Sequence, residues 1–506
     1  MEALSQLAVG FSVALQPLNL SLALGGVVVG TVVGMLPGIG PINAIAMLIP
    51  LLFAVGLPPE SSLILLSGIY YGSQYGNSIS TILLNVPGTA SAVVTAIDGH
   101  QMTKQGRGGE ALALAAVSSF VGGTLSILGL VFLAPALSRW AIRFGPAEYF
   151  ALMVFAFSAL SSVSGKSVPR ALAATGLGLF LATIGMDPNS AVPRYTFGQL
   201  RLFDGLDFVV VTIGLFAVSE VLLVLERTEW GSEAAARYGK VSMKLGALFK
   251  SFWSMIRGSV VGFFVGVLPG AGGTIAAFLS YSVEEKMAGE TGRFGRGDER
   301  GVAGPEAANN ASTTGAMIPL LTLGIPGSGT TAVLLGALLG LGLAPGPLLI
   351  ERNPEVFWGL AASMYVGNVF LLLLNLPLVG VFVRVLRLPR WILMPGVAAL
   401  SFVAVYAVNQ SPFDLVLMAG FGLLGYGMRK GGFPLAPVIL GLVLGPLMEK
   451  NLRRALALSG GEWSVMFSSS LAIGLWVMAV AALVIPWALG ARQRARALAG
   501  SGIGAE

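Results

Sequence analysis

Stretches of apolar residues without any charge alternate along the chain with short charged clusters. Asp, Glu, Lys and Arg are absent from residues 3–59, 61–97, 111–138, 258–283, 307–350, 356–383 and 463–491. A bilayer-spanning helix needs about 20 mainly apolar residues, so each stretch has room for at least one such helix. The stretches do not alternate in polarity, which favours helices over transmembrane strands. The pattern predicts an all-α polytopic membrane protein with about 10–14 transmembrane or re-entrant helical segments.

The composition strengthens this prediction. The 506 residues are 55% hydrophobic and only 11% charged, whereas a typical soluble domain is about 25% charged. The chain has no cysteine and one histidine, which excludes a disulfide framework, a cysteine nucleophile and a metal cluster built from His and Cys. The formal net charge of +6 is scattered over several loops, so we expect no nucleic-acid partner.

Basic residues indicate how the chain is oriented. Lys and Arg favour the cytoplasmic loops of membrane proteins, and here they gather in residues 227–257, 286–300, 384–390 and 492–496. We therefore expect these segments on the cytoplasmic side of a bacterial inner (plasma) membrane that the chain crosses many times. The N-terminus has neither the basic segment nor the cleavage site of a signal peptide, so we expect it to remain uncleaved.

Two motifs occur twice in the same order. GTVVGMLPGIGP (30–41) returns as GFFVGVLPGAGG (262–273) at an offset of 232 residues, and NVPGTAS (85–91) returns as GIPGSGT (324–330) at an offset of 239 residues. Such an arrangement indicates duplication of a membrane unit. We expect a first repeat half over residues 1–225, a basic cytoplasmic linker over 226–257, a second half over 258–491 and a cytoplasmic tail over 492–506.

The two halves could be related by inverted or by parallel topology. Equivalent loops of inverted repeats lie on opposite sides of the membrane and should differ in basic content. Residues 55–60 contain no Lys or Arg, whereas residues 286–300 contain four. This difference favours two inverted-topology repeats.

Each motif places Pro-Gly inside an uncharged stretch. Proline removes a helical N–H and glycine permits unusual backbone angles, so we expect broken helices or hairpins there. A break at membrane depth is tolerated only where protein or a water-filled cavity satisfies the backbone. The alternative is a kink or a close-packing device, which small residues commonly provide. The first motif of each half gives these candidates for the cavity: Pro37, Gly38, Gly40, Pro269, Gly270, Gly272 and Thr274.

The second motif of each half is followed by hydroxyl side chains at the expected start of a new helix. The N–H groups and the positive dipole end of a helix N-terminus attract a carboxylate. We therefore expect a substrate-binding set of Asn85, Pro87, Gly88, Thr89, Ser91, Pro326, Gly327, Ser328, Thr330 and Thr331.

Further polar side chains precede these motifs in otherwise apolar surroundings. They could supply oxygen ligands to a coupling cation such as Na⁺, or they could hydrogen-bond between helices. The cation-coupling candidates are Gln74, Asn77, Ser78, Ser80, Asn309, Asn310, Ser312 and Thr313. Four acids within or beside apolar segments are candidate proton relays or interfacial residues: Glu148, Glu220, Glu306 and Asp414. No Walker motif is present, so transport would use an ion gradient rather than ATP bound by this chain.

Five sequence segments, taken in order along the chain, resemble those of one known family. The matching segments are GTVVGMLPGIGP (30–41), GIYYGSQYGNSISTILLNVPGTAS (68–91), DGHQMTKQGRGGEAL (98–112), GVLPGAGGTIAAFLSYSVEEK (266–286) and PEAANNASTTGAMIPLLTLGIPGSGTTAVLLGAL (305–338). Over nearly its whole length the chain resembles the TctA family, the large membrane subunit of the tripartite tricarboxylate transporters.

The resemblance implies a permease that works with a small TctB-like membrane subunit and a periplasmic TctC-like solute-binding protein. It implies import of a tricarboxylate such as citrate, or of another carboxylate, by symport with Na⁺ or H⁺. It also implies alternating access with a moving substrate-binding domain, for which a homodimer is a suitable assembly. The resemblance implies no cofactor besides the coupling ion and no enzymatic activity. The alternatives are a non-transporting membrane scaffold or channel module, and a membrane-embedded enzyme.

Overall fold

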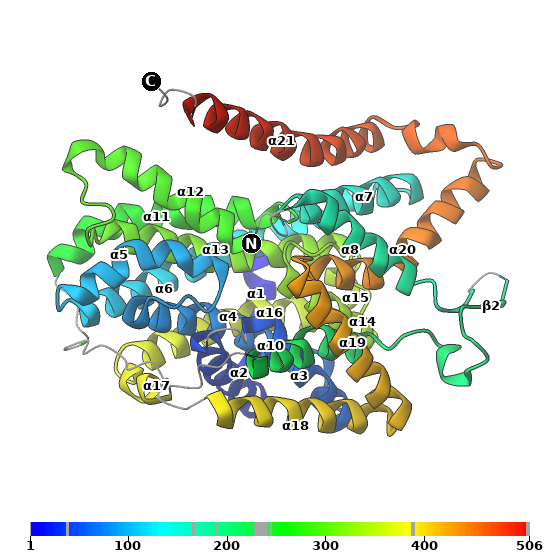
Figure 1. Cartoon of the computed structure of the whole chain (residues 1–506), viewed down its shortest axis with the longest axis horizontal. Coiled ribbons are helices and arrows are strands. Elements are labelled where there is room, and N and C mark those ends of the chain that lie inside the picture. Colours follow the sequence, from blue (N-terminus) through cyan, green and yellow to red (C-terminus); the bar gives the residue numbers. More distant parts are fainter. Residues whose placement is uncertain are drawn as a thin grey trace. The chain divides into compact units, whose positions relative to one another are not determined.

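The computed structural model describes residues 2–36, 40–163, 167–187, 190–226, 241, 245–270, 272–385 and 390–501. These residues are helical almost throughout (Figure 1). The sheet that they contain is one antiparallel pair of two-residue strands, β1 (Gly185–Met186) and β2 (Pro193–Arg194). The predicted all-α class is confirmed. Pro37 and Gly38, most of the linker and the end of the tail lie outside the described residues.

The chain folds into two compact units. The first unit comprises Met1–Ile142 and Val209–Tyr426, and the second comprises Arg143–Phe208 and Gly427–Glu506. The first unit is built from α1 (Glu2–Ala14), α2 (Pro17–Met35), α3 (Gly40–Val55), α4 (Pro59–Leu84), η1 (Ala90–Ala92), α5 (Val93–Lys104), α6 (Gly108–Ala141), α9 (Phe208–Ile213), η3 (Gly214–Val218), α10 (Ser219–Glu226), α11 (Leu245–Val267), α12 (Gly272–Ala288), η4 (Gly289–Thr291), α13 (Arg300–Leu323), α14 (Gly329–Gly340), α15 (Leu349–Arg352), α16 (Pro354–Asn375), α17 (Val379–Val385), α18 (Arg390–Asn409) and most of α19 (Pro412–Lys430). Each sequence half contributes to both units.

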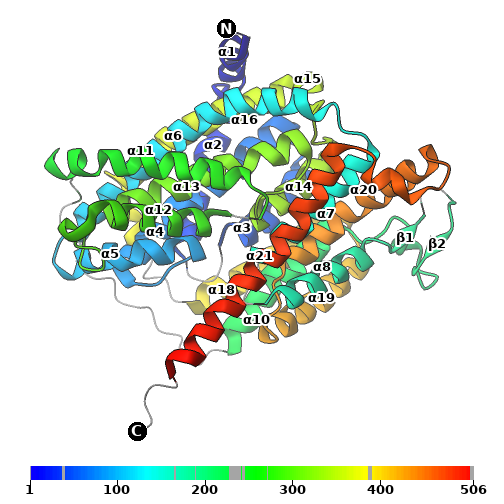
Figure 2. The same ribbon diagram turned by 90° about the horizontal axis from the view of Figure 1, so that it is seen from above.

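The second unit packs α7 (Pro146–Val163) and α8 (Val168–Leu181) with α20 (Ala436–Leu458) and α21 (Ser470–Ser501) (Figure 2). It also contains the strands and the short helices η2 (Leu200–Leu202) and η5 (Trp463–Phe467). Gly178 of α8 and Gly441 of α20 let the two backbones touch, because a Cβ at Gly441 would lie 2.6 Å from the Thr175 carbonyl oxygen. Arg194 and Arg453 both pair with Glu449, which closes one end of this unit.

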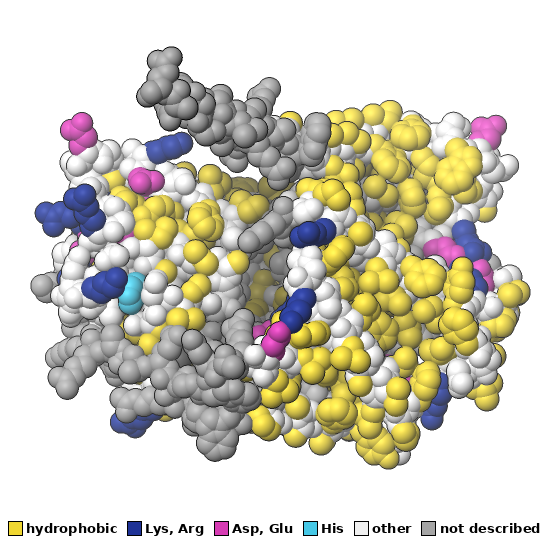
Figure 3. All heavy atoms as spheres, in the orientation of Figure 1, with side chains coloured by type: hydrophobic (Ala, Val, Ile, Leu, Met, Phe, Trp, Pro, Cys, Tyr) yellow, Lys and Arg dark blue, Asp and Glu magenta, His cyan; other side chains and the backbone are white. Residues whose placement is uncertain are grey.

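Apolar helices with exposed apolar side chains indicate a membrane environment. Among the described residues, four helical segments are long and apolar enough to cross a bilayer: Pro17–Met35, Gly108–Ala141, Phe208–Glu226 and Pro354–Asn375. Hydrophobic side chains cover much of the face drawn in Figure 3, and the charged side chains form small separate groups. Exposed apolar side chains of this kind suit contact with lipid rather than with water.

The first break in each half is a hairpin. Close contacts join Gly30 to Ile69 and Gly34 to Ser73, so α2 and α4 run in the same direction. Ser61 at the start of α4 also donates a 2.6 Å hydrogen bond to Asn19 near the start of α2. The helix between them, α3, must therefore return from the break at residues 36–40 to the level where α2 began.

The second half repeats this packing. Gly262 and Gly266 of α11 face Ala308 and Ser312 of α13, which are the positions equivalent to those in the first half at the offsets of 232 and 239 residues. In each pair a Cβ on the glycine would overlap a backbone carbonyl oxygen of the facing helix. The helices α11 and α13 lie side by side in both views (Figures 1 and 2). The duplication seen in the sequence therefore extends to the contacts between helices.

The equivalent long helices α4 and α13 run in opposite directions. Tyr71 contacts Thr314 through their hydroxyl groups. Further along α4, Gln74 accepts a 3.0 Å hydrogen bond from Asn309, and Ser78 donates a 2.7 Å hydrogen bond to Glu306. Later residues of α4 contact earlier residues of α13, so the two helices are antiparallel.

Two charged segments meet at one end of the first unit. Asp98 of α5 accepts hydrogen bonds from the backbone N–H groups of Gly297 and Asp298, at 2.8 and 2.9 Å. Arg107 pairs with Glu299, and Lys250 pairs with the same carboxylate at 2.6 Å. The charged segments 98–110 and 286–300 therefore lie at the same end of this unit.

The glycine contacts generate a stability prediction. We expect Gly30→Ala and Gly262→Ala each to destabilise the protein by about 1–3 kcal/mol, because the added methyl group forces two helix backbones apart. Gly25→Ala on the same helix is the matched control, since no atom lies within 4 Å of its Cβ position. The measurement is the thermal unfolding midpoint in detergent. Equal midpoints for all three variants would show that these glycines do not set the helix spacing.

The loop before α13 generates a pH prediction. Burial alone would raise the pKa of Asp298, but hydrogen bonds from the Arg300 side chain and from the backbone of Arg293 and Arg300 lower it from 3.8 to about 2. A carboxyl group with a lowered pKa stabilises the folded state above its ordinary pKa, and this contribution disappears as the pH falls through the folded value. We expect wild-type stability to fall between about pH 4 and pH 2. The Asp298→Asn variant should be less stable than the wild type at neutral pH. Its stability should also fall less than that of the wild type on acidification.

Candidate functional site

Three Pro-Gly motifs, at 87–88, 269–270 and 326–327, lie between helices, and Pro37-Gly38 lies outside the described residues. The preceding helices end at Met35, Leu84, Val267 and Leu323. At the second break of each half the residue after the helix is left-handed, with φ of 58° at Asn85 and 70° at Gly324. Asparagine and glycine are the residues that adopt this conformation most readily. The predicted broken helices are therefore confirmed.

The first of these two loops is held by a single side chain of α4. The Asn77 side-chain oxygen accepts hydrogen bonds from the N–H groups of Gly88 and Thr89, at 3.0 and 3.2 Å. Its amide nitrogen donates to the Thr89 hydroxyl, which lies 2.9 Å from the Ser91 hydroxyl. Asn77 thus satisfies the backbone of the loop and orients two hydroxyl groups at its end.

The second loop caps itself. Ser328 accepts a 3.3 Å hydrogen bond from the Thr331 N–H, and the Thr331 hydroxyl accepts a 2.8 Å bond from the Ser328 N–H. This reciprocal capping box fixes the start of α14. Tyr70 of α4 places its hydroxyl 3.3 Å from that of Ser328. The loop therefore joins the helix of the opposite half through a pair of hydroxyl groups.

The breaks of the two halves lie together. Within the second half, Gly270 donates a 3.1 Å backbone hydrogen bond to Gly327, which joins the two breaks of that half. A Cβ at Gly273 would lie 3.5 Å from the Cβ of Ser91, which belongs to the first half. Gly88 packs against the Gly34 carbonyl at the end of α2. We call the segments 85–91, 268–270, 272–273 and 324–331 the break-loop centre.

The cation-coupling candidates divide into two groups. Gln74, Asn77, Ser78, Asn309 and Asn310 make side-chain contacts between helices or to the first loop. The hydroxyls of Ser80, Ser312 and Thr313 instead bond carbonyl groups of their own helix. All eight are buried. The first group therefore lines the junction of α4 and α13, and the second group has contacts typical of hydroxyl side chains within a helix.

Three tyrosines of α4 belong to this region and were not predicted. Tyr70 reaches Ser328, Tyr71 reaches Thr314, and Tyr75 donates a 2.6 Å hydrogen bond to Asn368 of α16. A buried tyrosine hydroxyl generally needs a polar partner. Three tyrosines within six residues of the uncharged stretch 61–97 were the signal in the sequence.

The four acids occupy different places. Glu306 is fully buried and bonds side chains of α4, α5 and α6. Glu220 lies on α10 and Asp414 in the first turn of α19. Glu148 belongs to the second unit, where it accepts a 2.6 Å hydrogen bond from Ser469. Of the four, Glu306 is the acid that the structure joins to the candidate cation residues.

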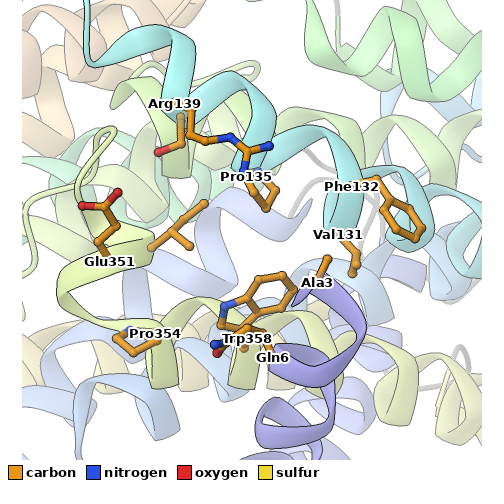
Figure 4. Close-up of a pocket in the computed structure, with 11 residues that line it drawn as sticks. Ala3, Gln6, Val131, Phe132, Pro135, Arg139, Glu351, Pro354 and Trp358 are labelled. Atoms are coloured by element: carbon orange, nitrogen blue, oxygen red, sulfur yellow. The ribbon is translucent and has the colours of Figure 1, made fainter. Parts of the chain in front are cut away.

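A groove of about 620 Å³ lies elsewhere in the first unit. Its lining includes Pro135 and Arg139 of α6, Glu351 of α15 and Trp358 of α16 (Figure 4). No residue of the break-loop centre lines it. Its size alone therefore does not make it the substrate site.

Comparisons with known proteins identify the family of this chain. A family model described as the tripartite tricarboxylate transporter TctA family matches residues 20–440. A protein of Agrobacterium vitis, described as an uncharacterized 52.8 kDa protein in the TAR-I ttuC′ 3′ region, is 42% identical over 485 residues, covering 96% of each chain. A second A. vitis protein, from the TAR-II ttuC′ 3′ region, is 42% identical over 228 residues, which are 44% of this chain and 94% of that protein.

An uncharacterized protein of Methanocaldococcus jannaschii is 35% identical over 116 residues, which are 23% of this chain and 28% of that protein. No solved structure was found to match the chain. The family model covers most of the sequence and includes all four breaks. This chain therefore belongs to the TctA family, the membrane permeases of tripartite tricarboxylate transporters.

Proposed function

We propose that this chain imports a tricarboxylate or another carboxylate across the bacterial inner membrane by symport with Na⁺ or H⁺. It does so as the permease subunit of a tripartite transporter, not as an enzyme. The observation that carries the proposal is the break-loop centre, where interrupted helices from both halves meet. In apolar surroundings such interruptions are found where they line a binding cavity.

The substrate carboxylates bind at the starts of the helices that follow the second breaks. Thr89 and Ser91 precede α5, and Ser328 and Thr330 lie at the start of α14. The positive end of each helix faces this region, which favours a negatively charged ligand. Tyr70 is added to the predicted binding set because its hydroxyl lies beside Ser328.

The directions of equivalent helices and the distribution of each sequence half over the two compact units support alternating access. The antiparallel course of α4 and α13 is the relation expected of inverted repeats. Each half also contributes one part to the first unit and another to the second. We propose that one unit carries the break-loop centre and moves, and that the other serves as a scaffold in an elevator-like cycle. A homodimer would support such a scaffold.

The partners follow from the family. A small TctB-like membrane subunit and a periplasmic TctC-like solute-binding protein assemble with the permease. The segments 98–110 and 286–300 meet at one end of the first unit, and 286–300 contains four Lys and Arg residues. We assign that end to the cytoplasm.

Bulky residues in the second breaks should abolish uptake. A Cβ at Gly327 would lie 2.9 Å from Ala316, and one at Gly88 would meet the end of α2. We expect Gly88→Leu and Gly327→Leu to reduce carboxylate uptake by at least about tenfold, because a shift of about 1 Å in a positioned group has effects of this size or larger. Gly25→Leu is the control, because this glycine of α2 has no atom within 4 Å of its Cβ position and is not left-handed. If the chain were instead a non-transporting scaffold, both variants would assemble normally and no measured function would be lost.

The energy source is tested in vesicles containing all three subunits. Uptake of radiolabelled carboxylate should require an imposed Na⁺ or H⁺ gradient, since this chain has no phosphate-binding loop for ATP. Collapsing both gradients should stop net accumulation. Accumulation that continues without either gradient would contradict symport.

A further inference from the structure

The groove bounded by α1, α6, α15 and α16 combines an apolar surface with two charges of opposite sign. Its volume of about 620 Å³ falls within the range of about 300–1,000 Å³ that is typical of ligand sites. Much of its lining is apolar and includes Val131, Phe132 and Trp358. Arg139 of α6 and Glu351 of α15 contribute one positive and one negative charge.

These two charges face the same groove without forming a pair. Both side chains are exposed, and Figure 4 shows them toward one side of the groove, with Val131 and Phe132 toward the other. Within the described part of the chain, neither Arg139 nor Glu351 takes part in an ion pair. Each charge is therefore available to the opposite charge of a ligand that lies between them.

The length of α6 places Arg139 at the level of lipid headgroups. Glu110, in the first turn of α6, pairs with Arg107 at the charged end of the first unit. Arg139 is 29 residues further along the helix, which corresponds to about 43 Å at 1.5 Å per residue. A bilayer with its headgroup regions is about 40–45 Å thick. Arg139 therefore lies at the surface of the leaflet opposite the charged segments 98–110 and 286–300.

Neighbouring residues occupy the same level. Ser138 donates a hydrogen bond to the carbonyl of Pro347, just before α15, so Glu351 lies near the end of α6 as well. Trp140, which follows Arg139, has an exposed side chain, and tryptophan is enriched where a membrane protein meets the headgroups. The charged side of the groove is therefore at a membrane interface.

An exposed apolar stripe leads from the groove toward the middle of the bilayer. Leu125, Leu128 and Phe132 have exposed side chains, and their spacing of three and four residues puts them on one face of α6. Phe132 also lines the groove and precedes Arg139 by seven residues, or about 10 Å along the helix. An acyl chain whose headgroup reaches Arg139 would run along this stripe.

We propose that the groove binds one molecule of phosphatidylethanolamine. The lipid phosphate pairs with Arg139, the primary ammonium group pairs with Glu351, and an acyl chain packs on Phe132 and the stripe. Phosphatidylglycerol has no positive charge for Glu351. The quaternary ammonium of phosphatidylcholine has no N–H group to donate to that carboxylate. This lipid site does not depend on the proposed transport function.

The test is lipid binding to the purified, delipidated full chain in detergent. Phosphatidylethanolamine, phosphatidylcholine and phosphatidylglycerol with identical acyl chains are titrated separately, and bound lipid is counted by native mass spectrometry. We expect saturable binding of one phosphatidylethanolamine per chain, about fivefold tighter than either other lipid, because one exposed ion pair contributes an effect of this size. Equal binding of the three lipids would overturn the proposal.

Two variants test which charges read the headgroup. Arg139→Gln should weaken binding of phosphatidylethanolamine and phosphatidylglycerol about fivefold, since both carry the phosphate. Glu351→Lys should reverse the preference toward phosphatidylglycerol, because two cations then face an anionic lipid. The matched controls are Arg352→Gln and Glu355→Gln, which change exposed neighbours outside the groove lining and should leave binding unchanged.

The remaining outcomes separate a lipid from other occupants. If Arg139→Gln does not fold, the reversed preference of Glu351→Lys decides. Retention of the wild-type preference by Glu351→Lys overturns the proposal. Equally tight binding of water-soluble glycerophosphoethanolamine would show a headgroup site without a lipid and would also overturn it. A groove that retains no lipid, but in which Phe132→Cys cross-links to the small membrane subunit, belongs to that protein partner instead.

Discussion

The structure depends on the need to satisfy backbone groups where helices are interrupted in an apolar environment. Each interruption leaves N–H and C=O groups that lipid cannot bond. Here protein groups bond them: Asn77 in the first half, the Ser328 and Thr331 capping box in the second, and the backbone pair of Gly270 and Gly327. These bonds hold each break within its own half. The contacts of Ser91 with Gly273 and of Tyr70 with Ser328 then bring the breaks of the two halves together.

Close helix packing makes these contacts possible. The glycines of α2 and α11 bring each helix against the backbone of α4 or α13, so the hairpin tip of each half reaches its second break. Small residues at helix interfaces are a common means of close approach in membranes. The same spacing recurs in both halves, which shows that duplication preserved the contacts between helices as well as the motifs.

The two halves are not equivalent at the site. Position 316, which corresponds to Asn77 at the offset of 239 residues, is alanine. The first loop is therefore capped by a distant side chain and the second by its own residues. Glu306 likewise corresponds to Ser67 in the first half. The repeated framework thus carries a different set of polar groups in each half.

Local features of the fold could be predicted from the sequence, and relations between distant helices could not. Proline and glycine determine where α4 and α13 end, since their effect on the backbone is local. The hairpin course of α2 and α3 depends on which helix pairs with which, and the motifs alone do not contain that information. For the same reason Ser78 was identified as a candidate, but its bond to Glu306 was not, nor were the bonds of Thr95 and Ser119 to the same carboxylate.

The central claim is that breaks from the two halves meet at one place, and a cross-link measures this directly. The chain has no native cysteine, and Ser91 lies with its Cβ 3.5 Å from the Cβ position of Gly273, within the range of disulfides. We would combine Ser91→Cys with Gly273→Cys, insert a protease site within residues 227–240, and oxidise the protein in membranes. The account predicts that the two fragments remain joined after cleavage and separate only on reduction. The control pairs Ser91→Cys with Gly396→Cys, which also lies on the C-terminal fragment and has no atom within 4 Å of its Cβ position, and should give separate fragments throughout. Fragments of the Ser91→Cys/Gly273→Cys protein that separate without reductant would contradict it.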